Sequence, residues 1–501
     1  MTTENDKTPN TQPQDDLSIT QHSIVIDGRE LRYTATTGTL ILKAEVDEPK
    51  GDDKPQEIEQ PKAAVFFTAY TLEMDEAVGE ADPRRSRPLT FAFNGGPGSS
   101  SVWLHLGLLG PRRVQMGEEG HMLQPPFDLV DNAYSLLDQT DLVFIDPVTT
   151  GYSRPVPGEA AKQFHGFKPD IEWVGEFIRL YTTRYRRWNS PKFLIGESYG
   201  TTRSAGLAGY LQERHGMYLN GILLISSILD FQTARFVPGN DLPFALFLPT
   251  YAATAWYHGR LPADLQADLA KTLAEAEAFA ENEYTLALMR GSRLQGEARA
   301  QIVAKLARLT GLSPDYLEVT DLRIQIHRFV KELLRDEGRT TGRLDTRFKG
   351  IDRDAAGESF EFDPSLCAIT GPYTAMLNDY VRSELAYESD LPYEILTGRV
   401  HPWSYETHQN QFVNVAETLR KAMSINPYLK VFVANGFYDL ATPYFATRYT
   451  FDHLGLDASL RGNISMTYYE AGHMMYIHQP SLVQLKADTA AFIRSALPVV
   501  A

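Results

Sequence analysis

The sequence predicts an α/β protein with a mostly parallel central sheet, flanked by helices and interrupted by a large helical insertion. Between residues 88 and 230, apolar runs of strand length alternate with helical patterns. Residues 235–425 lose this alternation and are mostly helical in pattern, and strand-like runs return at 431–434 and 464–469. Strands that alternate with helices form parallel sheets through right-handed crossovers, so the two flanking parts are expected to share one sheet.

The N-terminal part predicts a disordered tail and then an antiparallel edge of the sheet. Residues 1–20 are rich in Thr, Asn, Gln, Asp and Pro, a composition that does not support a packed core. The runs that follow are apolar and β-branched, and Asp27-Gly28 between two of them is a hairpin turn signal. Residues 49–61 are charged and are expected to form a loop.

The alternating region supplies the predicted core elements in chain order. Strands are predicted at 88–93, 141–146, 191–195 and 221–227, and helices at about 101–109, 168–188 and 201–214. The first strand runs into Asn94-Gly95-Gly96-Pro97-Gly98-Ser99-Ser100, and the third into Gly196-Glu197-Ser198-Tyr199-Gly200. Both stretches lie at carboxyl ends of predicted strands, where open α/β sheets place their binding sites.

The stretch around Ser198 is predicted to be a nucleophile elbow. It matches the pattern G-x-S-x-G and joins a predicted strand to a predicted helix. Such a turn strains the serine backbone and exposes its Oγ, while Gly196 and Gly200 let strand and helix approach closely. A bare match also occurs by chance in loops, so the prediction rests on the strand–turn–helix context.

Two further strand ends supply the partners that a nucleophilic serine needs. Asp439, after Gly436-Phe437-Tyr438, and His473, within Ala471-Gly472-His473-Met474, each follow a predicted strand. The chain order Ser198, Asp439, His473 is that of α/β-hydrolases, which predicts this fold. Asp452 is a nearby alternative for the acid, but it lies in a predicted helix, so Asp439 is favoured.

These residue types suit acyl transfer. A serine hydroxyl is a poor nucleophile near neutral pH, so Ser198 needs His473 as a base and Asp439 to fix the imidazole tautomer. The developing oxyanion needs backbone donors, which the N–H of Tyr199 and the loop at Gly95-Gly96 can supply.

The helical insertion is predicted to be a cap over this site. We expect a tail at 1–20, a first core part with the oxyanion loop and elbow at 21–234, a cap at 235–425, and a second core part with the acid and histidine at 426–501. The alternative is a separate domain with its own function. A cap is favoured because the sheet must resume after the insertion to complete the site.

Together these motifs resemble those of the serine carboxypeptidases of peptidase family S10. The resemblance rests on Asn94 to Ser100, Gly196 to Gly200, Gly436-x-x-Asp439 and Ala471 to Met474. It implies a peptidase that releases C-terminal residues from a peptide substrate through an acyl-enzyme, without metal or cofactor. The resemblance also implies that the backbone N–H groups of Gly96 and Tyr199 form the oxyanion hole.

Other functions stay open at this point. An esterase, an acyltransferase or a peptidase with another end-specificity could use the same scaffold. A catalytically silent binding protein belongs to a different class, and the intact set of Ser198, Asp439 and His473 argues against it.

The resemblance also implies how a C-terminal carboxylate is held. Asn94, Gly95 and Glu197 occupy three of the four binding positions of the family, and Leu108 occupies the fourth, where relatives have a second glutamate. Two close carboxyls share a proton and can donate a hydrogen bond to a carboxylate. Leu108 leaves this arrangement incomplete.

Either of two changes could compensate for Leu108. The pKa of Glu197 could be strongly raised, or a cation could bind the substrate carboxylate as a forked ion pair. We expect the cation, supplied by Arg112 or Arg113, whose alternative interpretation is solvated surface charge. A pH optimum near neutrality follows.

Composition excludes several function classes. The formal net charge is −16 and no basic stripe is evident, which argues against nucleic acid as a partner. No metal-ligand spacing and no Walker-type loop is present, so no metal or cofactor is expected. The sequence does not specify the oligomeric state.

Location is inferred from cysteine content and apolar runs. Cys367 is the single cysteine, expected to be a small buried side chain, and it excludes an intrachain disulfide. Residues 1–17 lack the pattern of a signal peptide, and no apolar run approaches the roughly 20 residues of a membrane span. A cytoplasmic protein without a membrane partner is expected, with prior removal of a signal peptide as the alternative.

Overall fold

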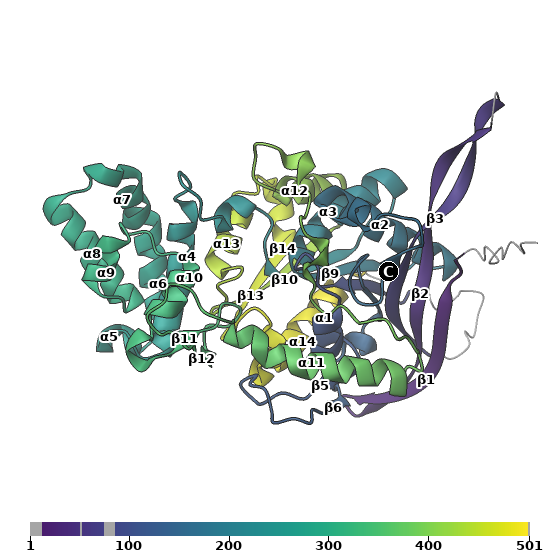
Figure 1. Cartoon of the computed structure of the whole chain (residues 1–501), viewed down its shortest axis with the longest axis horizontal. Coiled ribbons are helices and arrows are strands. Elements are labelled where there is room, and N and C mark those ends of the chain that lie inside the picture. Colours follow the sequence, from purple (N-terminus) through teal and green to yellow (C-terminus); the bar gives the residue numbers. More distant parts are fainter. Residues whose placement is uncertain (1–12, 51–52, 75–85, 499–501) are drawn as a thin grey trace, which may run out of the picture.

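A ten-stranded sheet runs through the part of the chain that the computed structural model describes, residues 13–50, 53–74 and 86–498 (Figure 1). The strand order is β1-β2-β3-β7-β4-β9-β10-β13-β14, with β8 paired to β3. The bounds are β1 (Asp16–Ile26), β2 (Arg29–Lys50), β3 (Asp53–Leu72), β4 (Leu89–Phe93), β7 (Asp141–Ile145), β8 (Arg154–Pro155), β9 (Lys192–Ser198), β10 (Gly221–Ser227), β13 (Lys430–Gly436) and β14 (Ile464–Tyr469).

The sheet is parallel from β7 to β14 and antiparallel from β1 to β7, as the alternating and N-terminal patterns predict. Within the parallel part, Phe93 of β4 pairs with Gly196 of β9, and Gly436 of β13 pairs with Tyr469 of β14. The carboxyl ends of these strands therefore meet at one edge of the sheet. An α/β-hydrolase fold with a mostly parallel sheet is confirmed.

The N-terminal strands are longer than predicted. Residues 16–20 belong to β1, so the expectation of a disordered tail is wrong for them, while residues 1–12 lie outside the described part. β2 and β3 pair as far as Lys50 and Asp53, with an irregularity after Glu48, so most of the predicted loop at 49–61 is strand. Their tips project from the molecule as a two-stranded ribbon (Figure 1). A ribbon that projects from the core needs no apolar alternation, which is why the sequence pattern does not reveal it.

Helices cover both faces of the sheet. One face packs against α2 (Phe167–Arg184), α3 (Tyr199–His215) and α12 (Ala416–Ile425), and the other against α1 (Val102–Leu104), α11 (Pro364–Ser383) and α14 (Gln479–Ser495). Successive residues of one strand enter opposite hydrophobic clusters: Leu194 lies in one and Ile195 in the other. Burial on both faces explains why these strands are continuous apolar runs.

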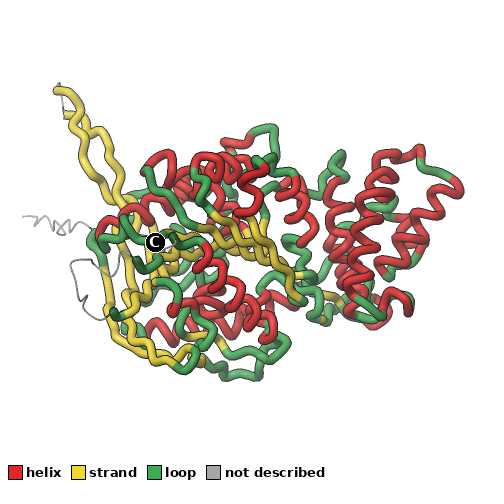
Figure 2. Tube along the Cα trace, turned by 180° about the vertical axis from the view of Figure 1, so that it is seen from behind, coloured by secondary structure: helices red, strands yellow, loops and turns green. Residues whose placement is uncertain are grey.

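The insertion forms a helical block at the end of the molecule opposite to the projecting ribbon (Figures 1 and 2). It contains α4 (Leu242–Tyr257), α5 (Ala263–Gln266), α6 (Leu269–Phe279), α7 (Thr285–Arg290), α8 (Gly296–Thr310), α9 (Pro314–Val319) and α10 (Ile326–Glu332). A third hydrophobic cluster joins these helices to Tyr438, Leu440 and α13 (Tyr444–Asp452) of the core. Ser313 caps the start of α9, since its Oγ accepts the Tyr316 N–H at 3.2 Å.

Two short ribbons and the long helix α11 lie outside the main sheet. β5 (Arg112–Val114) pairs with β6 (Leu129–Asp131), and β11 (Thr340–Thr341) pairs with β12 (Lys349–Gly350). α11 then runs from the helical block along the core (Figure 1). Cys367 is exposed on α11 and not buried as expected, because the neighbouring Ala368 and Ile369 take the core-facing positions of that helix. Among the described helices, none has the length and apolarity needed to cross a membrane.

Candidate active site

Ser198 lies at a sharp turn between β9 and α3. Its φ is 59° and its ψ is −128°, a conformation that is strained for a residue with a side chain. A Cβ on Gly196 would lie 2.1 Å from the carbonyl oxygen of Gly200, so both positions require close backbone approach. Thr201 Oγ1 donates to the Ser198 carbonyl at 2.7 Å and supports the turn. These features are those expected of a nucleophile elbow.

Asp439 and His473 are joined by a hydrogen bond. His473 Nδ1 lies 2.7 Å from Asp439 Oδ2, and both side chains are buried. Asp439 also accepts the backbone N–H groups of Ala441 and Thr442, at 2.7 and 3.1 Å, and the Thr442 hydroxyl at 2.7 Å. Burial alone would raise the pKa of Asp439, but His473 and these hydrogen bonds hold it below its usual value.

The pKa of His473 is shifted in the opposite direction, above its usual value. Burial alone would lower the pKa of His473, but the carboxylates of Asp439 and Glu197 raise it above its usual value. The carboxylate at Nδ1 favours the tautomer that leaves Nε2 available as a base.

Ser198 and His473 line one pocket of about 370 Å³, which Asn94, Gly95, Gly96 and Glu197 also line. The Ser198 side chain makes no hydrogen bond to another described residue. Ser198 and His473 thus border the same space, which can hold a substrate.

The backbone of the Gly95-Gly96 loop lies against the elbow. A Cβ on Gly95 would lie 2.4 Å from the backbone nitrogen of Tyr199, and Gly96 has a φ of +105°. Tyr199 is the first residue of α3, so its N–H has no acceptor within the helix. The Gly95-Gly96 loop and the first residue of α3 thus lie together beside Ser198.

Glu197 is buried between two hydrogen-bond donors. Asn94 Nδ2 donates to Oε1 at 2.9 Å, and the Tyr476 hydroxyl donates to Oε2 at 2.5 Å. Burial is the largest influence and raises the pKa of Glu197 to about 7, although His473 and the two donors oppose it. The carboxyl group can therefore carry a proton near neutral pH.

Comparison with known proteins decides the family. The sequence pattern of the family described as serine carboxypeptidase matches residues 59–479. The chain belongs to the serine carboxypeptidase family. No curated protein sequence matches it significantly.

A solved carboxypeptidase structure shows the same fold. Kex1Δp, a prohormone-processing carboxypeptidase from Saccharomyces cerevisiae, aligns with a TM-score of 0.55 at 16% identity, over 92% of this chain and 91% of that one. At this identity the match to Kex1Δp shows a shared fold. A proline iminopeptidase from Mycobacterium smegmatis aligns with a TM-score of 0.35 at 13% identity, over 90% and 98% of the two chains.

Tyr476 is a hydrogen-bond partner of Glu197 that the sequence analysis did not identify. The Leu108 side chain is buried in a hydrophobic cluster, and the Tyr476 ring packs beside Gly107, where a Cβ would lie 2.5 Å from it. In this serine carboxypeptidase the second partner of Glu197 is thus a phenol from the segment after His473. The only sequence signal was its position three residues after His473.

The two predicted arginines are not in the pocket. Arg112 pairs with Asp131 at 2.5 Å and with Glu384 at 2.9 Å, and neither Arg112 nor Arg113 lines the space beside Ser198. The prediction failed because the chain turns away after residue 110 and enters the β5–β6 ribbon. Arg343 lines the pocket instead, and no motif pointed to it.

Within residues 13–50, 53–74 and 86–498, no three His, Cys, Asp or Glu side chains lie close enough together to hold a metal ion.

Proposed function

We propose that this member of the serine carboxypeptidase family hydrolyses the C-terminal peptide bond of a peptide substrate through Ser198, His473 and Asp439. The observation that carries the proposal is the 2.7 Å bond between His473 and Asp439 at a pocket that also exposes a strained Ser198. Kex1Δp, which shares the fold, is itself a carboxypeptidase.

The groups present can perform each step. Ser198 Oγ attacks the scissile carbonyl carbon as its proton passes to His473 Nε2, and the N–H groups of Gly96 and Tyr199 stabilise the oxyanion. His473 then gives that proton to the leaving amine, which departs as the released amino acid and leaves an acyl-enzyme on Ser198. Water attacks this ester, with His473 again as the base, and Ser198 recovers its proton as the shortened peptide leaves.

Glu197, Asn94 and Gly95 support recognition of the C-terminal carboxylate. A buried Glu197 with a pKa of about 7 keeps a proton that it can donate to a substrate carboxylate. In this proposal Tyr476 replaces the second carboxyl as the group that holds Glu197 in position.

The direct test is a mixed peptide library incubated with the protein and analysed by mass spectrometry. Stepwise loss of residues from the carboxyl end is expected. Shortening from the amino end, or hydrolysis of simple esters but no peptide, would contradict the proposal.

The pH profile should report Glu197 and His473 together. Below its pKa His473 is protonated and cannot act as a base, so kcat should rise as pH increases through that value. Above about pH 7 Glu197 becomes a carboxylate, so KM for free-acid peptides should rise. The optimum is therefore expected near neutrality, measured as kcat and KM between pH 5 and 9.

Glu197→Gln is the matched variant for this prediction. Glutamine stays neutral, so the rise in KM above pH 7 should disappear while the rise of kcat with pH, caused by His473, remains. A wild-type optimum at pH 4–5, abolished by Glu197→Gln, would show that Glu197 titrates far below 7 and would contradict the prediction.

We also propose a cytoplasmic setting and no nucleic-acid partner. The single cysteine and the net charge of −16 support these two points.

A further inference from the structure

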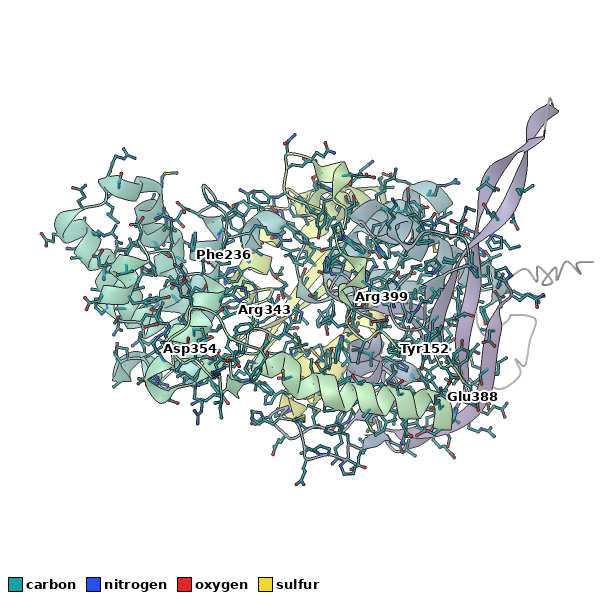
Figure 3. The ribbon with its side chains drawn as sticks, viewed as in Figure 1. Tyr152, Phe236, Arg343, Asp354, Glu388 and Arg399 are labelled. Atoms are coloured by element: carbon teal, nitrogen blue, oxygen red, sulfur yellow. The ribbon has the colours of Figure 1, made fainter. Side chains whose placement is uncertain are left out.

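Arg343 lies where two pockets meet. It lines the pocket of Ser198 and His473, and it also lines a second pocket of about 640 Å³ between the helical block and the core. The second pocket includes Phe236 and His327 from the block and Leu440 from the core, and Arg343 is the residue that the two pockets share. Figure 3 labels Arg343 between the helical block and the core.

The main chain fixes Arg343 relative to the catalytic residues. The Arg343 carbonyl accepts the N–H of Leu440, which follows Asp439, at 3.0 Å. The carbonyl of the next residue, Leu344, accepts the N–H of His473 at 2.7 Å. The Arg343 side chain therefore starts from a backbone position that is tied to both the acid and the base.

The Arg343 guanidinium forms no hydrogen bond and no ion pair with another described residue, and the charges of His473 and His327 that act on it are also cationic when present. Asp363 accepts the backbone N–H of Arg343 at 3.2 Å, and its carboxylate also caps α11 through Ser365. Arg347, four residues later, shows the contrast, because its guanidinium pairs with Asp345 at 2.8 Å. A half-buried guanidinium at a substrate pocket that no protein carboxylate neutralises is suited to bind an anion brought by the substrate.

We infer that Arg343 is a specificity-determining residue whose guanidinium binds a carboxylate of the peptide substrate. This inference rests on the proposed function. It assigns to Arg343 the role that the sequence analysis expected of Arg112 or Arg113, that of a cation in the substrate pocket. The carboxylate can come from the C-terminus of the substrate or from an acidic side chain beside the scissile bond. A fork of N–H donors suits either source.

The test compares kcat/KM of the full-length protein and its Arg343→Gln variant on matched blocked peptides. In one pair, the same peptide ends either in a free carboxylate or in an amide. In the other pairs, a residue on one side of the scissile bond is either Glu or Gln. Loss of an ion-paired hydrogen bond should lower kcat/KM by about 10- to 100-fold, through KM, only for peptides that carry the recognised carboxylate. Arg343→Lys should restore part of the loss, since it keeps the charge but not the fork.

Arg399→Gln is the matched control. Arg399, labelled in Figure 3, follows Gly398 of the pocket wall. Its guanidinium pairs with Glu394 at 2.8 Å. This variant should leave all substrate ratios unchanged. Arg399→Gln should also keep wild-type turnover of a neutral ester. Both variants should keep the wild-type melting temperature, which separates a loss of substrate binding from a loss of folding.

The outcomes separate the inference from the proposed function. A loss confined to free acids assigns Arg343 to the C-terminal carboxylate, and a loss confined to Glu peptides assigns it to an acidic side chain. An active wild-type carboxypeptidase whose Arg343→Gln variant keeps every ratio would overturn the inference alone. A wild-type protein that cleaves no peptide would overturn the proposed function.

Discussion

Replacing Ser198 with alanine should lower kcat for peptide hydrolysis by about 10⁵- to 10⁶-fold. Without Oγ no acyl-enzyme can form, and His473, held by Asp439, has no hydroxyl group to deprotonate. The fold should remain, because the contact that supports this turn is made by Thr201 to the backbone carbonyl. Steady-state kinetics and covalent labelling by a fluorophosphonate measure the effect, and labelling should be lost.

Ser227→Ala is a matched control for this prediction. Ser227 ends the neighbouring strand β10 in register with Ser198, and its buried Oγ has no hydrogen-bond partner among the described residues. This variant should keep activity and labelling near the wild-type level. Full labelling of Ser198→Ala, or loss of activity in Ser227→Ala alone, would show that the nucleophile has been assigned wrongly.

The sequence predicted the parts of the fold in which local pattern and burial agree. The strands of the parallel sheet are apolar throughout because both faces of the sheet are covered. The elbow after β9 requires glycines because its backbone segments lie too close together for side chains. The projecting part of β2 and β3 was missed because strands that leave the core need no apolar face. The exposure of Cys367 was missed because residue type does not say which side of α11 faces the core.

The same distinction applies to the site. Ser198 ends one strand of the sheet, and Asp439 and His473 follow two others, so their chain positions were enough to predict that they lie at one edge of it. Arg343 enters from the segment between the helical block and the core, and Tyr476 from a turn after the histidine. Their positions depend on how the insertion docks and how Gly107 leaves space for a ring, which no local pattern contains.

Replacing Asp439 with asparagine should lower kcat by about 10⁴-fold. The carboxylate accepts hydrogen bonds from Ala441, Thr442 and His473, and its lowered pKa keeps it ionised at working pH. An asparagine can offer His473 an N–H in place of an oxygen, which would stabilise the tautomer that has no base at Nε2. It would also remove the charge that stabilises the imidazolium. Kinetics at pH 7 measure the loss, and part of it should be recovered at higher pH, where hydroxide can assist.

Asp452→Asn makes the same chemical change at the alternative acid. Asp452 is the exposed last residue of α13, whereas Asp439 lies fully buried 2.7 Å from the imidazole. Asp452→Asn should therefore keep nearly wild-type kcat. Burial of Asp439 explains the contrast, because a charge removed from water acts on His473 with little screening, while an exposed carboxylate is screened by solvent and salt. A collapse of activity in Asp452→Asn with little change in Asp439→Asn would reverse the assignment of the acid.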